Sequence, residues 1–448
     1  MTQSLSDLTQ QLLDVARRAG ADDADAIAVD GTSVSIDVRA GNLEHAERSE
    51  GTEIGLRVLL GRRQACVSSS DTKLATMMEM AERAIAMARE APEDQHVGLA
   101  DPSQVTQDTD VSALEIFDPS DEPDPAMLQD YAARAEAAAL RNPCISQVQS
   151  ASAGYTNRRV HLTTSNGFSG GFARTSHGLS CVAISGTGSD MERDYDYDSR
   201  VFQMDLRDPD DIGTSAAARA VERVGAKKPK TGAYPVLFDE RVASALIGSL
   251  LQACDGSKVA RGSSWLRDAI GEQVLPKGLS LIEDPHRQRS ALSRKFDAEG
   301  LMTSRRAIVD DGVLTGWTLD LATARKLGMQ STANASRGTN APPSPSLTNV
   351  MLTQGDQSRD DLIRQMGTGL LVTSMIGSTI NPNTGDYSRG AAGFWVESGE
   401  IAYPVNECTV AGNLREMLMR IIPANDARTY LTRVVPSLLV EGLILAGD

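Results

Sequence analysis

Alternating polar and apolar positions predict strands in the first half of the chain. In residues 33–39 every second side chain is apolar, and the same period of two recurs over residues 54–60. Strands with a single apolar face are typical of half-buried antiparallel sheets. The pair Asn166-Gly167 lies between two further strand patterns and is a strong signal for a tight hairpin. This half is therefore predicted to contain antiparallel hairpins.

Apolar residues spaced three or four apart predict helices around these strands. In one of them, residues 74–88, Asp71 is the expected N-cap. A later helix is expected to have Asp239 as its N-cap and Gly256 as its C′ residue. Together with an alanine-rich stretch and a segment closing the first half, the predicted helices cover residues 7–18, 74–88, 125–141, 210–224 and 239–254.

Short strands joined by tight turns predict a different architecture for the second half. Turns at Asp311-Gly312 and Ser398-Gly399 each join two strand patterns. Closely spaced hairpins of this kind indicate a β-sandwich or a barrel-like body. The expected fold class is therefore α+β, with an N-terminal α+β region of antiparallel sheets and flanking helices, followed by a large strand-rich C-terminal domain.

Two breaks in these patterns divide the chain. Residues 91–125 contain five prolines among acidic and hydroxyl side chains, which is typical of a linker or a surface crossing. The short basic stretch Lys227–Lys230 contains another proline and marks a second boundary. The predicted organisation is an N-terminal α+β domain (1–95), a linker (96–124), a central α+β domain (125–226) and a C-terminal β-rich domain (232–448).

Composition narrows the classes of function. The 448 residues carry a formal net charge of −16. Because such an acidic surface repels phosphate backbones, no nucleic-acid partner is expected. The five cysteines are far apart and form no Cys-x-x-Cys pair, which indicates reduced thiols instead of a zinc ribbon. The first residues lack the apolar core of a signal peptide, and no stretch is apolar enough to span a membrane. A cytoplasmic protein with no membrane partner is expected.

The residues that usually catalyse hydrolysis form no familiar motif here. The five histidines stand apart, and the patterns His-Glu-x-x-His and Gly-x-Ser-x-Gly are absent. Acidic residues recur at every second position of residues 191–200. Because a calcium loop would also need a glycine turn and a terminal glutamate, we interpret this run as a solvated strand face or loop.

Two stretches are candidates for contact with a substrate. Asp297 and Glu299 stand two residues apart, which fits an acid/base pair or a turn whose aspartate caps backbone amides. The segment Asn381–Gly390 can present backbone amides to an extended ligand, or form a plain Ω-loop. We predict that both stretches line one cleft. The predicted substrate-binding residues are Asp297, Glu299, Asp386, Ser388 and Gly393.

Several long segments resemble, in order, the TldD/PmbA family. In the first half the resemblance is carried by AERSEGTEIGLRVLLGRRQACVSSSD. In the second half it is carried by GSSWLRDAIGEQVLP, FDAEGLMTSRRAIVDDGVLTGWTLDLATARKLGMQSTANASRG, PSLTNVMLTQGD and GLLVTSMIGSTINPNTGDYSRGAAGFWVESGEIAYPVNECTVAGNLREML. The resemblance covers nearly the whole chain, and several long motifs in the right order make it specific.

The resemblance includes one clear departure. The TldD branch of the family carries His-Glu-x-x-x-His on the helix before a Gly-Ser/Thr-Ser turn, and a cysteine near the end of the chain. Here those helix positions fall in Ile247–Gln252, and the final stretch RVVPSLLVEGLILAGD has no cysteine. Zinc cannot be held in its usual geometry without such ligands. The chain is therefore similar to the PmbA branch, also called TldE, and no catalytic or metal-binding residue is expected on it.

The resemblance implies a subunit of a cytosolic metallopeptidase that cuts unfolded or modified peptides. Zinc would belong to a TldD-type partner in a heterodimer, while this chain would line the substrate channel; alone, it is expected to form a homodimer. The alternative is a metal-free peptide-binding or regulatory protein of the gyrase-modulator type that acts as a homodimer. A third hypothesis is an independent hydrolase whose site is assembled from scattered residues.

Overall fold

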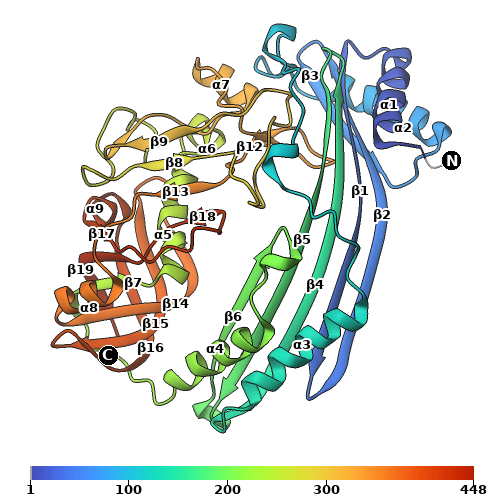
Figure 1. Cartoon of the computed structure of the whole chain (residues 1–448). Helices are drawn as coiled ribbons and strands as arrows, with labels where there is room; N and C mark the ends of the chain where they lie inside the picture. Colours follow the sequence, from blue (N-terminus) through green and yellow to red (C-terminus); the bar gives the residue numbers. More distant parts are fainter. Residues whose placement is uncertain (1–2, 448) are drawn as a thin grey trace.

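One long antiparallel sheet runs through the first half of the computed structural model, which describes residues 3–447 (Figure 1). Its strand order is β3-β2-β1-β4-β5-β6. At its centre, residues 25–38 of β1 pair with residues 151–164 of β4, which come much later in the chain. The strands are β1 (Asp23–Arg39), β2 (Asn42–Leu60), β3 (Arg63–Ser69), β4 (Ile145–Thr164), β5 (Ser169–Ser185) and β6 (Glu192–Arg200).

Two pairs of helices cover the two ends of this sheet. α1 (Leu5–Ala19) and α2 (Leu74–Glu90) bury leucine, alanine and methionine side chains against β1, β2 and β3 at one end. α3 (Pro125–Leu140) and α4 (Pro209–Glu222) pack on the other end through mainly alanine side chains (Figure 1). Residues before 95 and residues after 125 thus contribute strands to the same sheet.

The second half of the chain is built on a sheet that closes on itself. Its order is β16-β15-β14-β7-β19-β17, and β16 pairs with β19 as well as with β15. A second sheet, β10-β9-β8-β13-β18, and a short pair, β11 and β12, complete this half. The strands are β7 (Gly232–Phe238), β8 (Leu281–Glu283), β9 (Arg306–Asp310), β10 (Val313–Leu314), β11 (Ala335–Ser336), β12 (Ser344–Pro345), β13 (Val350–Leu352), β14 (Gly369–Ile380), β15 (Asp386–Glu397), β16 (Glu400–Asn413), β17 (Ile421–Pro423), β18 (Arg433–Val434) and β19 (Leu438–Ala446).

A helix packs against the closed sheet and belongs to the largest apolar core. In α5 (Glu240–Ala253), Leu246, Ile247 and Leu250 are fully buried. Asp239 caps this helix by accepting a hydrogen bond from the Arg241 backbone amide at 3.2 Å. The remaining helices are α6 (Gly256–Ala260), α7 (Leu321–Leu327), α8 (Arg359–Met366), α9 (Leu414–Leu418) and the 3-10 turns η1 (Pro102–Gln104), η2 (Ser112–Leu114), η3 (Gly188–Asp190) and η4 (Gln203–Asp205).

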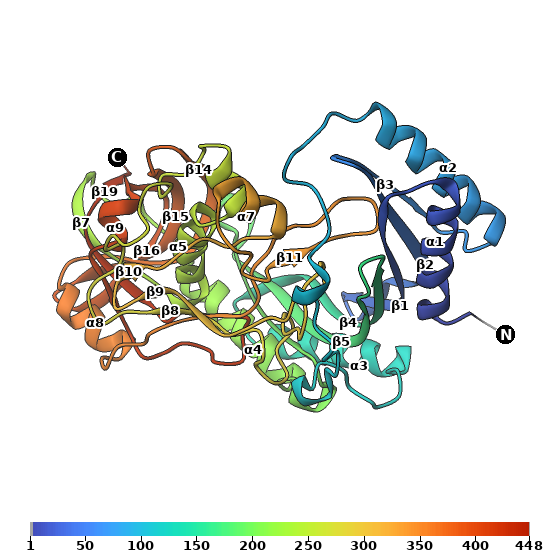
Figure 2. The same ribbon diagram turned by 90° about the horizontal axis from the view of Figure 1, so that it is seen from above.

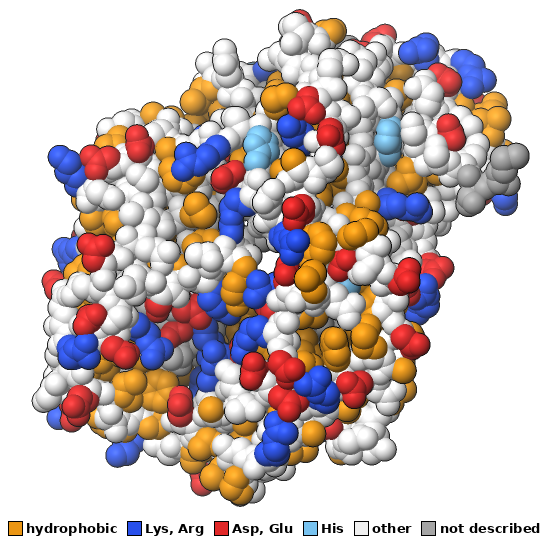
Figure 3. All heavy atoms as spheres, in the orientation of Figure 1, with side chains coloured by type: hydrophobic (Ala, Val, Ile, Leu, Met, Phe, Trp, Pro, Cys, Tyr) orange, Lys and Arg blue, Asp and Glu red, His pale blue; other side chains and the backbone are white. Residues whose placement is uncertain are grey.

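The two halves meet through buried loop contacts. The loop after β11 reaches the long sheet beside β2, where a Cβ on Gly55 would come within 2.1 Å of the Thr339 carbonyl oxygen (Figure 2). In the same place Arg337 forms an ion pair with the buried Asp25. Between the halves the surface is hollowed, and basic and acidic side chains gather there (Figure 3). The close approach of Thr339 leaves no room for a side chain at residue 55, so this contact between the halves requires glycine there.

The predicted fold class is confirmed, and two local predictions are wrong. Asp71 does not cap α2, since Lys73 precedes the helix and Asp71 instead accepts from the Lys73 backbone amide. Gly256 does not end α5, because it is the first residue of α6, which begins after the capping residue Asp255. In both cases the observed helix boundary lies one or two positions from the predicted one, at Lys73 before α2 and at Asp255 after α5.

The acidic run is a strand, as one interpretation proposed, but its aspartates are not solvated. Asp194, Asp196 and Asp198 in β6 are 5%, 2% and 2% exposed. Asp196, for example, forms ion pairs with two arginines, Arg207 at 2.8 Å and Arg219 at 2.9 Å. The period of two placed these carboxylates on one face correctly, but the arginines that allow that face to be buried come from α4 and neighbouring segments.

Candidate functional site

A cleft beside α5 brings together residues that are far apart in the sequence. One face of the helix, with Ala245, Gly248, Ser249 and Gln252, forms one wall of a cavity of about 360 Å³. The hairpin between β14 and β15 forms another wall. The other lining residues are Ala253, Lys258, Ser263, Trp265, Ile380, Pro382, Arg389 and Arg433. The cleft thus joins the middle of α5 to a hairpin more than a hundred residues later.

The charged groups of this α5 cleft are all basic. Lys258 Nζ donates to Gln252 Oε1 at 3.2 Å, and Arg389 Nε donates to the Gly377 carbonyl oxygen at 2.7 Å. Within residues 3–447, Lys258, Arg389 and the exposed Arg433 take part in no ion pair with a carboxylate. The cleft is therefore a small region of positive charge on an acidic protein, suited to groups that accept hydrogen bonds.

The donor atoms of the α5 cleft do not fit a zinc ion. Among the described residues, no histidine, cysteine, aspartate or glutamate lines it, and structural and catalytic zinc sites are built from those side chains. Over the described residues, no group of three or more such side chains is placed to hold a metal. Three basic side chains around the cleft would also repel a divalent cation.

The Asp297–Glu299 turn uses its carboxylates to hold the backbone. Asp297 accepts hydrogen bonds from the amides of Glu299 at 2.9 Å, Leu301 at 3.0 Å and Ala335 at 3.0 Å. Glu299 accepts from the Leu321 amide at 2.8 Å. Both side chains are almost fully buried, and burial raises the pKa of each carboxyl; Asp297 and Asp320 nearby raise that of Glu299 further. These contacts match the capping-turn interpretation.

Family models match nearly all of the chain, in three consecutive parts. Residues 24–88 match domain 1, residues 118–224 the central domain and residues 231–447 the C-terminal domain of the PmbA/TldA metallopeptidases. The chain is 36% identical to Metalloprotease PmbA of Escherichia coli O157:H7, over 93% of this chain and 90% of that protein. The chain belongs to the PmbA/TldD metallopeptidase family. A homologue of PmbA in Haemophilus influenzae is 33% identical over 100% of this chain and 97% of its own length.

Solved structures of PmbA/TldD-like proteins have the same fold. A Bacteroides thetaiotaomicron protein described as a candidate modulator of DNA gyrase superposes with a TM-score of 0.91 at 27% identity, over 98% of both chains. TldE from Thermococcus kodakarensis superposes with a TM-score of 0.86 at 20% identity, over 98% of this chain and 99% of that one. The second likeness concerns the fold alone.

Neither of the two cavities described for this family member, the α5 cleft and one between the halves, is lined by all of the predicted substrate-binding residues. Asp297 lines a cavity between the long sheet and the C-terminal half, and the hairpin that follows β14 lines the α5 cleft instead. Asp386 is exposed and accepts from Thr384 Oγ1 at 2.6 Å, while Ser388 is half-buried within β15. Glu299, Asp386 and Ser388 line neither of these two cavities.

Gly393 is required for strand pairing. A Cβ added there would lie 1.9 Å from the Leu371 carbonyl oxygen of the neighbouring strand β14. The predicted close approach therefore exists, but its partner is a strand of the same sheet. The substitution Gly393→Val would consequently test folding and could not report on substrate binding.

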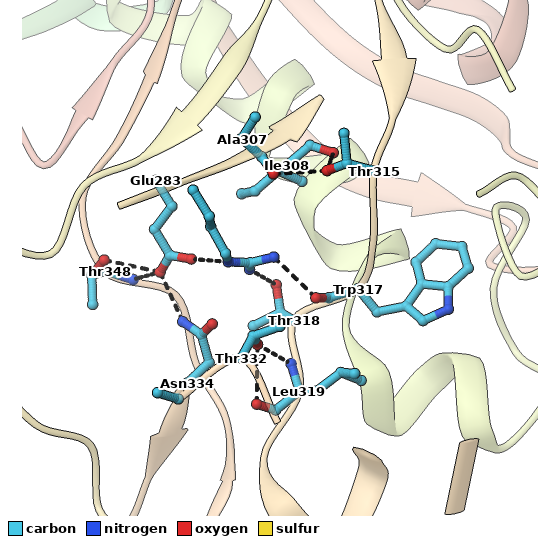
Figure 4. A network of polar contacts seen from close by, with 12 residues as sticks. Glu283, Ala307, Ile308, Thr315, Trp317, Thr318, Leu319, Thr332, Asn334 and Thr348 are labelled. Atoms are coloured by element: carbon cyan, nitrogen blue, oxygen red, sulfur yellow. Dashed lines mark hydrogen bonds and ion pairs between the residues drawn. The ribbon is translucent and has the colours of Figure 1, made fainter. Parts of the chain in front are cut away.

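Sequence reasoning identified part of the α5 cleft and missed the rest. The resemblance to the PmbA/TldD family pointed to α5, and the glycine-rich composition pointed to the hairpin. Lys258, Trp265 and Arg433 were missed. Trp265 lies in one of the segments that carry the family resemblance, but nothing in the sequence connects the three residues, so tertiary structure was needed to place them together. Other buried carboxylates form scaffold networks, such as Glu283, which accepts from Arg306 Nε at 2.8 Å and from the Thr348 amide at 2.7 Å (Figure 4).

Proposed function

We propose that the chain is a PmbA/TldE-type subunit of a TldD/TldE-like metallopeptidase complex in the cytoplasm. In this proposal a TldD-type partner carries zinc and performs catalysis on unfolded or modified peptides. This chain lines the substrate channel and positions the peptide. The observation that carries the proposal is the α5 cleft, which lies where the resemblance places the zinc motif but has basic and uncharged side chains in place of metal ligands.

The chemistry of the α5 cleft supports a positioning role. Peptide carbonyl oxygens and acidic side chains accept hydrogen bonds, and the cleft offers Lys258, Arg389 and Arg433 as donors beside the indole of Trp265. Holding a peptide in a fixed orientation raises the rate at which a separate catalytic group attacks it. No step of peptide hydrolysis is assigned to a residue of this chain.

An exposed strand edge supports association with another chain. β2 pairs with β3 through residues 54–60, whereas residues 42–53 pair with β1 on one side and have no strand on the other within the described chain. An unpaired edge can add a strand from another molecule. We propose that this surface contributes to the heterodimer and, in the absence of the partner, to a twofold homodimer.

A second candidate function rests on the solved relative described as a candidate modulator of DNA gyrase. In that case the chain would be a metal-free peptide-binding or regulatory homodimer that needs no catalytic partner. The two functions differ in what the α5 cleft does. In the first it contributes to peptide hydrolysis by a complex, and in the second it contributes to binding alone.

Co-expression with a TldD-type subunit that carries His-Glu-x-x-x-His tests the first proposal. We expect the two chains to co-purify and the pair to hydrolyse an unfolded peptide substrate that neither chain hydrolyses alone. The variant Ala245→Trp, which fills the α5 cleft, should lower kcat/KM of the pair by about tenfold or more while pairing persists. Ala137→Trp, the same substitution at an exposed position of α3, is the matched control and should have no effect.

Failure to pair, with full peptide binding by the chain alone, would favour the regulatory homodimer. Peptide hydrolysis by the purified chain without a partner would favour an independent hydrolase. If the pair is active and Ala245→Trp behaves like Ala137→Trp, the complex is real but the α5 cleft is not part of its substrate channel.

A further inference from the structure

A second cavity, separate from the α5 cleft, lies between the long sheet and the C-terminal half. It has a volume of about 250 Å³. Strands β1, β4 and β5 provide one wall, and residues 292–298, 335–337 and 346–347 provide the other. The size suits a fragment such as one aromatic acid, because drug-sized ligands occupy roughly 300–1,000 Å³. We call this space the arginine cavity after the side chains described next.

Three arginines line the arginine cavity without an acidic partner. Within residues 3–447, neither Arg158, Arg174 nor Arg294 forms an ion pair. Arg294 donates to the carbonyl oxygens of Ala335 at 3.0 Å and Ser346 at 2.7 Å. Arg174 donates to the Ser293 carbonyl. These are neutral acceptors, so the positive charges are oriented but not neutralised.

The other charged residues of the arginine cavity do not compensate for this excess. Arg337 also lines it, and its charge is paired with Asp25 on the long sheet. Asp297 is the one carboxylate among the lining residues in the part of the chain that the structure describes. Its oxygens already accept three backbone amides, and burial raises the pKa of its carboxyl. The cavity therefore keeps a net positive charge.

Three arginines of low exposure elsewhere in this molecule show the paired arrangement. The buried or nearly buried arginines Arg57, Arg241 and Arg306 each contact a carboxylate, at 2.5 Å, 2.5 Å and 2.8 Å respectively. In the arginine cavity, burial and, to a smaller extent, the charges of Arg294 and Arg158 together lower the pKa of Arg174 to about 10. The Nε atoms of Arg174 and Arg294 are buried without a hydrogen-bond partner. Such a cluster is stabilised when an anion enters it.

The remaining lining of the arginine cavity is mostly apolar. Phe172 and Phe296 have ring centroids 6.3 Å apart, and the guanidinium of Arg174 lies 5.3 Å from the centre of the Phe172 ring. The aliphatic side chains are Ile27, Val160, Leu162, Leu292 and Leu347. A fully hydrated anion such as inorganic phosphate would leave this apolar surface unused.

We propose that the arginine cavity binds an organic carboxylate, in which the carboxylate meets Arg158, Arg174 and Arg294 and an apolar group packs on Phe172 and Phe296. Arginine pairs well with carboxylates because its planar N–H groups match the two oxygens. Two sources of this chemistry fit, namely a free aryl or alkyl acid and the C-terminal residue of a peptide. The site goes beyond the proposed peptide channel, and its existence does not depend on a partner subunit.

Calorimetric titration of the full chain with 3-phenylpropionate tests the site, with 3-phenylpropionamide as the uncharged control. We expect the acid to bind at least tenfold more tightly than the amide, because hydrogen bonds between two charged groups are stronger than those to a neutral amide. Arg174→Gln and Arg158→Gln should each weaken binding of the acid by about tenfold or more. Arg158 is exposed at the rim, so its replacement keeps the test valid if Arg174→Gln folds poorly.

The matched control for Arg158→Gln is Arg159→Gln. Arg159 is the next residue on β4, pairs with Asp30 at 2.5 Å and is absent from the cavity lining. Successive side chains of a strand point to opposite faces. We expect Arg159→Gln to leave the affinity for 3-phenylpropionate unchanged. Equal binding of acid and amide, equal affinity of Arg158→Gln and wild type, or no binding of the acid at millimolar concentration would overturn the proposal.

A second pair of probes separates the two sources of carboxylate. The peptide Ala-Ala-Phe with a free C-terminus is compared with its C-terminal amide. Tighter binding of the peptide acid than of 3-phenylpropionate, with loss of binding in the amide, assigns the site to peptide C-termini. Binding of 3-phenylpropionate but not of the peptide acid assigns it to free acids. Because these titrations use the chain alone, their outcome is distinguishable from failure of the proposed metallopeptidase complex.

Discussion

The charged side chains near the two ends of α5 differ in whether they are paired with a group of opposite charge. At its first turn every charged side chain has a partner of opposite sign. Glu240 pairs with Arg428 at 2.8 Å, and Arg241 pairs with Asp194 at 2.5 Å. Further along the same helix, the cleft face carries small or uncharged side chains next to Lys258, Arg389 and Arg433, which have no carboxylate partner in residues 3–447.

This difference separates scaffold from candidate binding surface. A buried pair whose hydrogen bonds are satisfied gains nothing from a further ligand, whereas removal of one partner leaves an uncompensated charge. Basic groups that face a cavity without an acid retain the capacity to bind one. The same contrast holds between the paired aspartates of β6 and the arginine cavity. The polarity of a region is thus less informative than whether its charges are paired.

The largest effect is expected from breaking the paired end. Arg241→Gln should lower the free energy of unfolding by about 3–5 kcal/mol, because it leaves Asp194 buried at 5% exposure without its closest cation. Arg223, at 3.5 Å from Asp194, can reduce this cost. Urea unfolding followed by circular dichroism measures the change. A loss below about 1 kcal/mol would show that pairing at this end of α5 contributes little to stability, which would contradict the contrast between the two ends of the helix.

A smaller, pH-dependent effect is expected from Glu299→Gln. The folded chain raises the pKa of Glu299 through burial and through Asp297 and Asp320, so the folded state favours the protonated carboxyl. Stability from this group is fully present below the unfolded pKa of roughly 4.3 and is lost as pH rises toward the folded value. Glutamine resembles the protonated form. The stability of the variant relative to wild type should therefore rise with pH above the unfolded pKa of roughly 4.3.

Unfolding midpoints of wild type and Glu299→Gln between pH 4 and pH 8 check this expectation. Glu53→Gln, the same substitution at an exposed position of β2, is the matched control. A difference between Glu299→Gln and wild type that stays constant with pH would show that folding does not raise the pKa of Glu299, which contradicts the expectation.

The smallest effect on stability is expected at the cleft end of α5. Arg433→Gln should change the free energy of unfolding by less than about 0.5 kcal/mol, because Arg433 is exposed and has no ion pair within the described chain. The same variant should weaken peptide hydrolysis by the reconstituted pair, measured as kcat/KM. A stable, fully active variant would remove Arg433 from the proposed channel, and a strongly destabilised one would show that the residue belongs to the scaffold.

Local patterns predicted the elements well because they depend on near neighbours. The helix predicted at 239–254 and its Asp239 cap correspond to α5, and Asn166-Gly167 lies at the turn between β4 and β5. The long sheet was harder to foresee. Its central pairing joins residues 25–38 to residues 151–164, and no short-range signal specifies such a distant partner.

Burial of charge was the main feature that the sequence did not specify. The alternation of the acidic residues in β6 was correct, but arginines on α4 and α5 decide that this face is covered. Likewise Asp297 and Glu299 are not an exposed acid pair, because they accept hydrogen bonds from the backbone amides of Ala335 and Leu321. The arginine cavity had no sequence signal, since its three unpaired arginines come from β4, β5 and a loop of the C-terminal half.

Metal content and peptide hydrolysis, measured together on the isolated chain and on its pair with a TldD-type subunit, test the central claim most directly. We expect far less than one zinc per isolated chain, because the described residues of the α5 cleft include no zinc ligand. We expect about one zinc per pair, with hydrolysis confined to the pair. About one tightly bound zinc in the isolated chain, together with peptide hydrolysis that a chelator abolishes, would contradict the central claim.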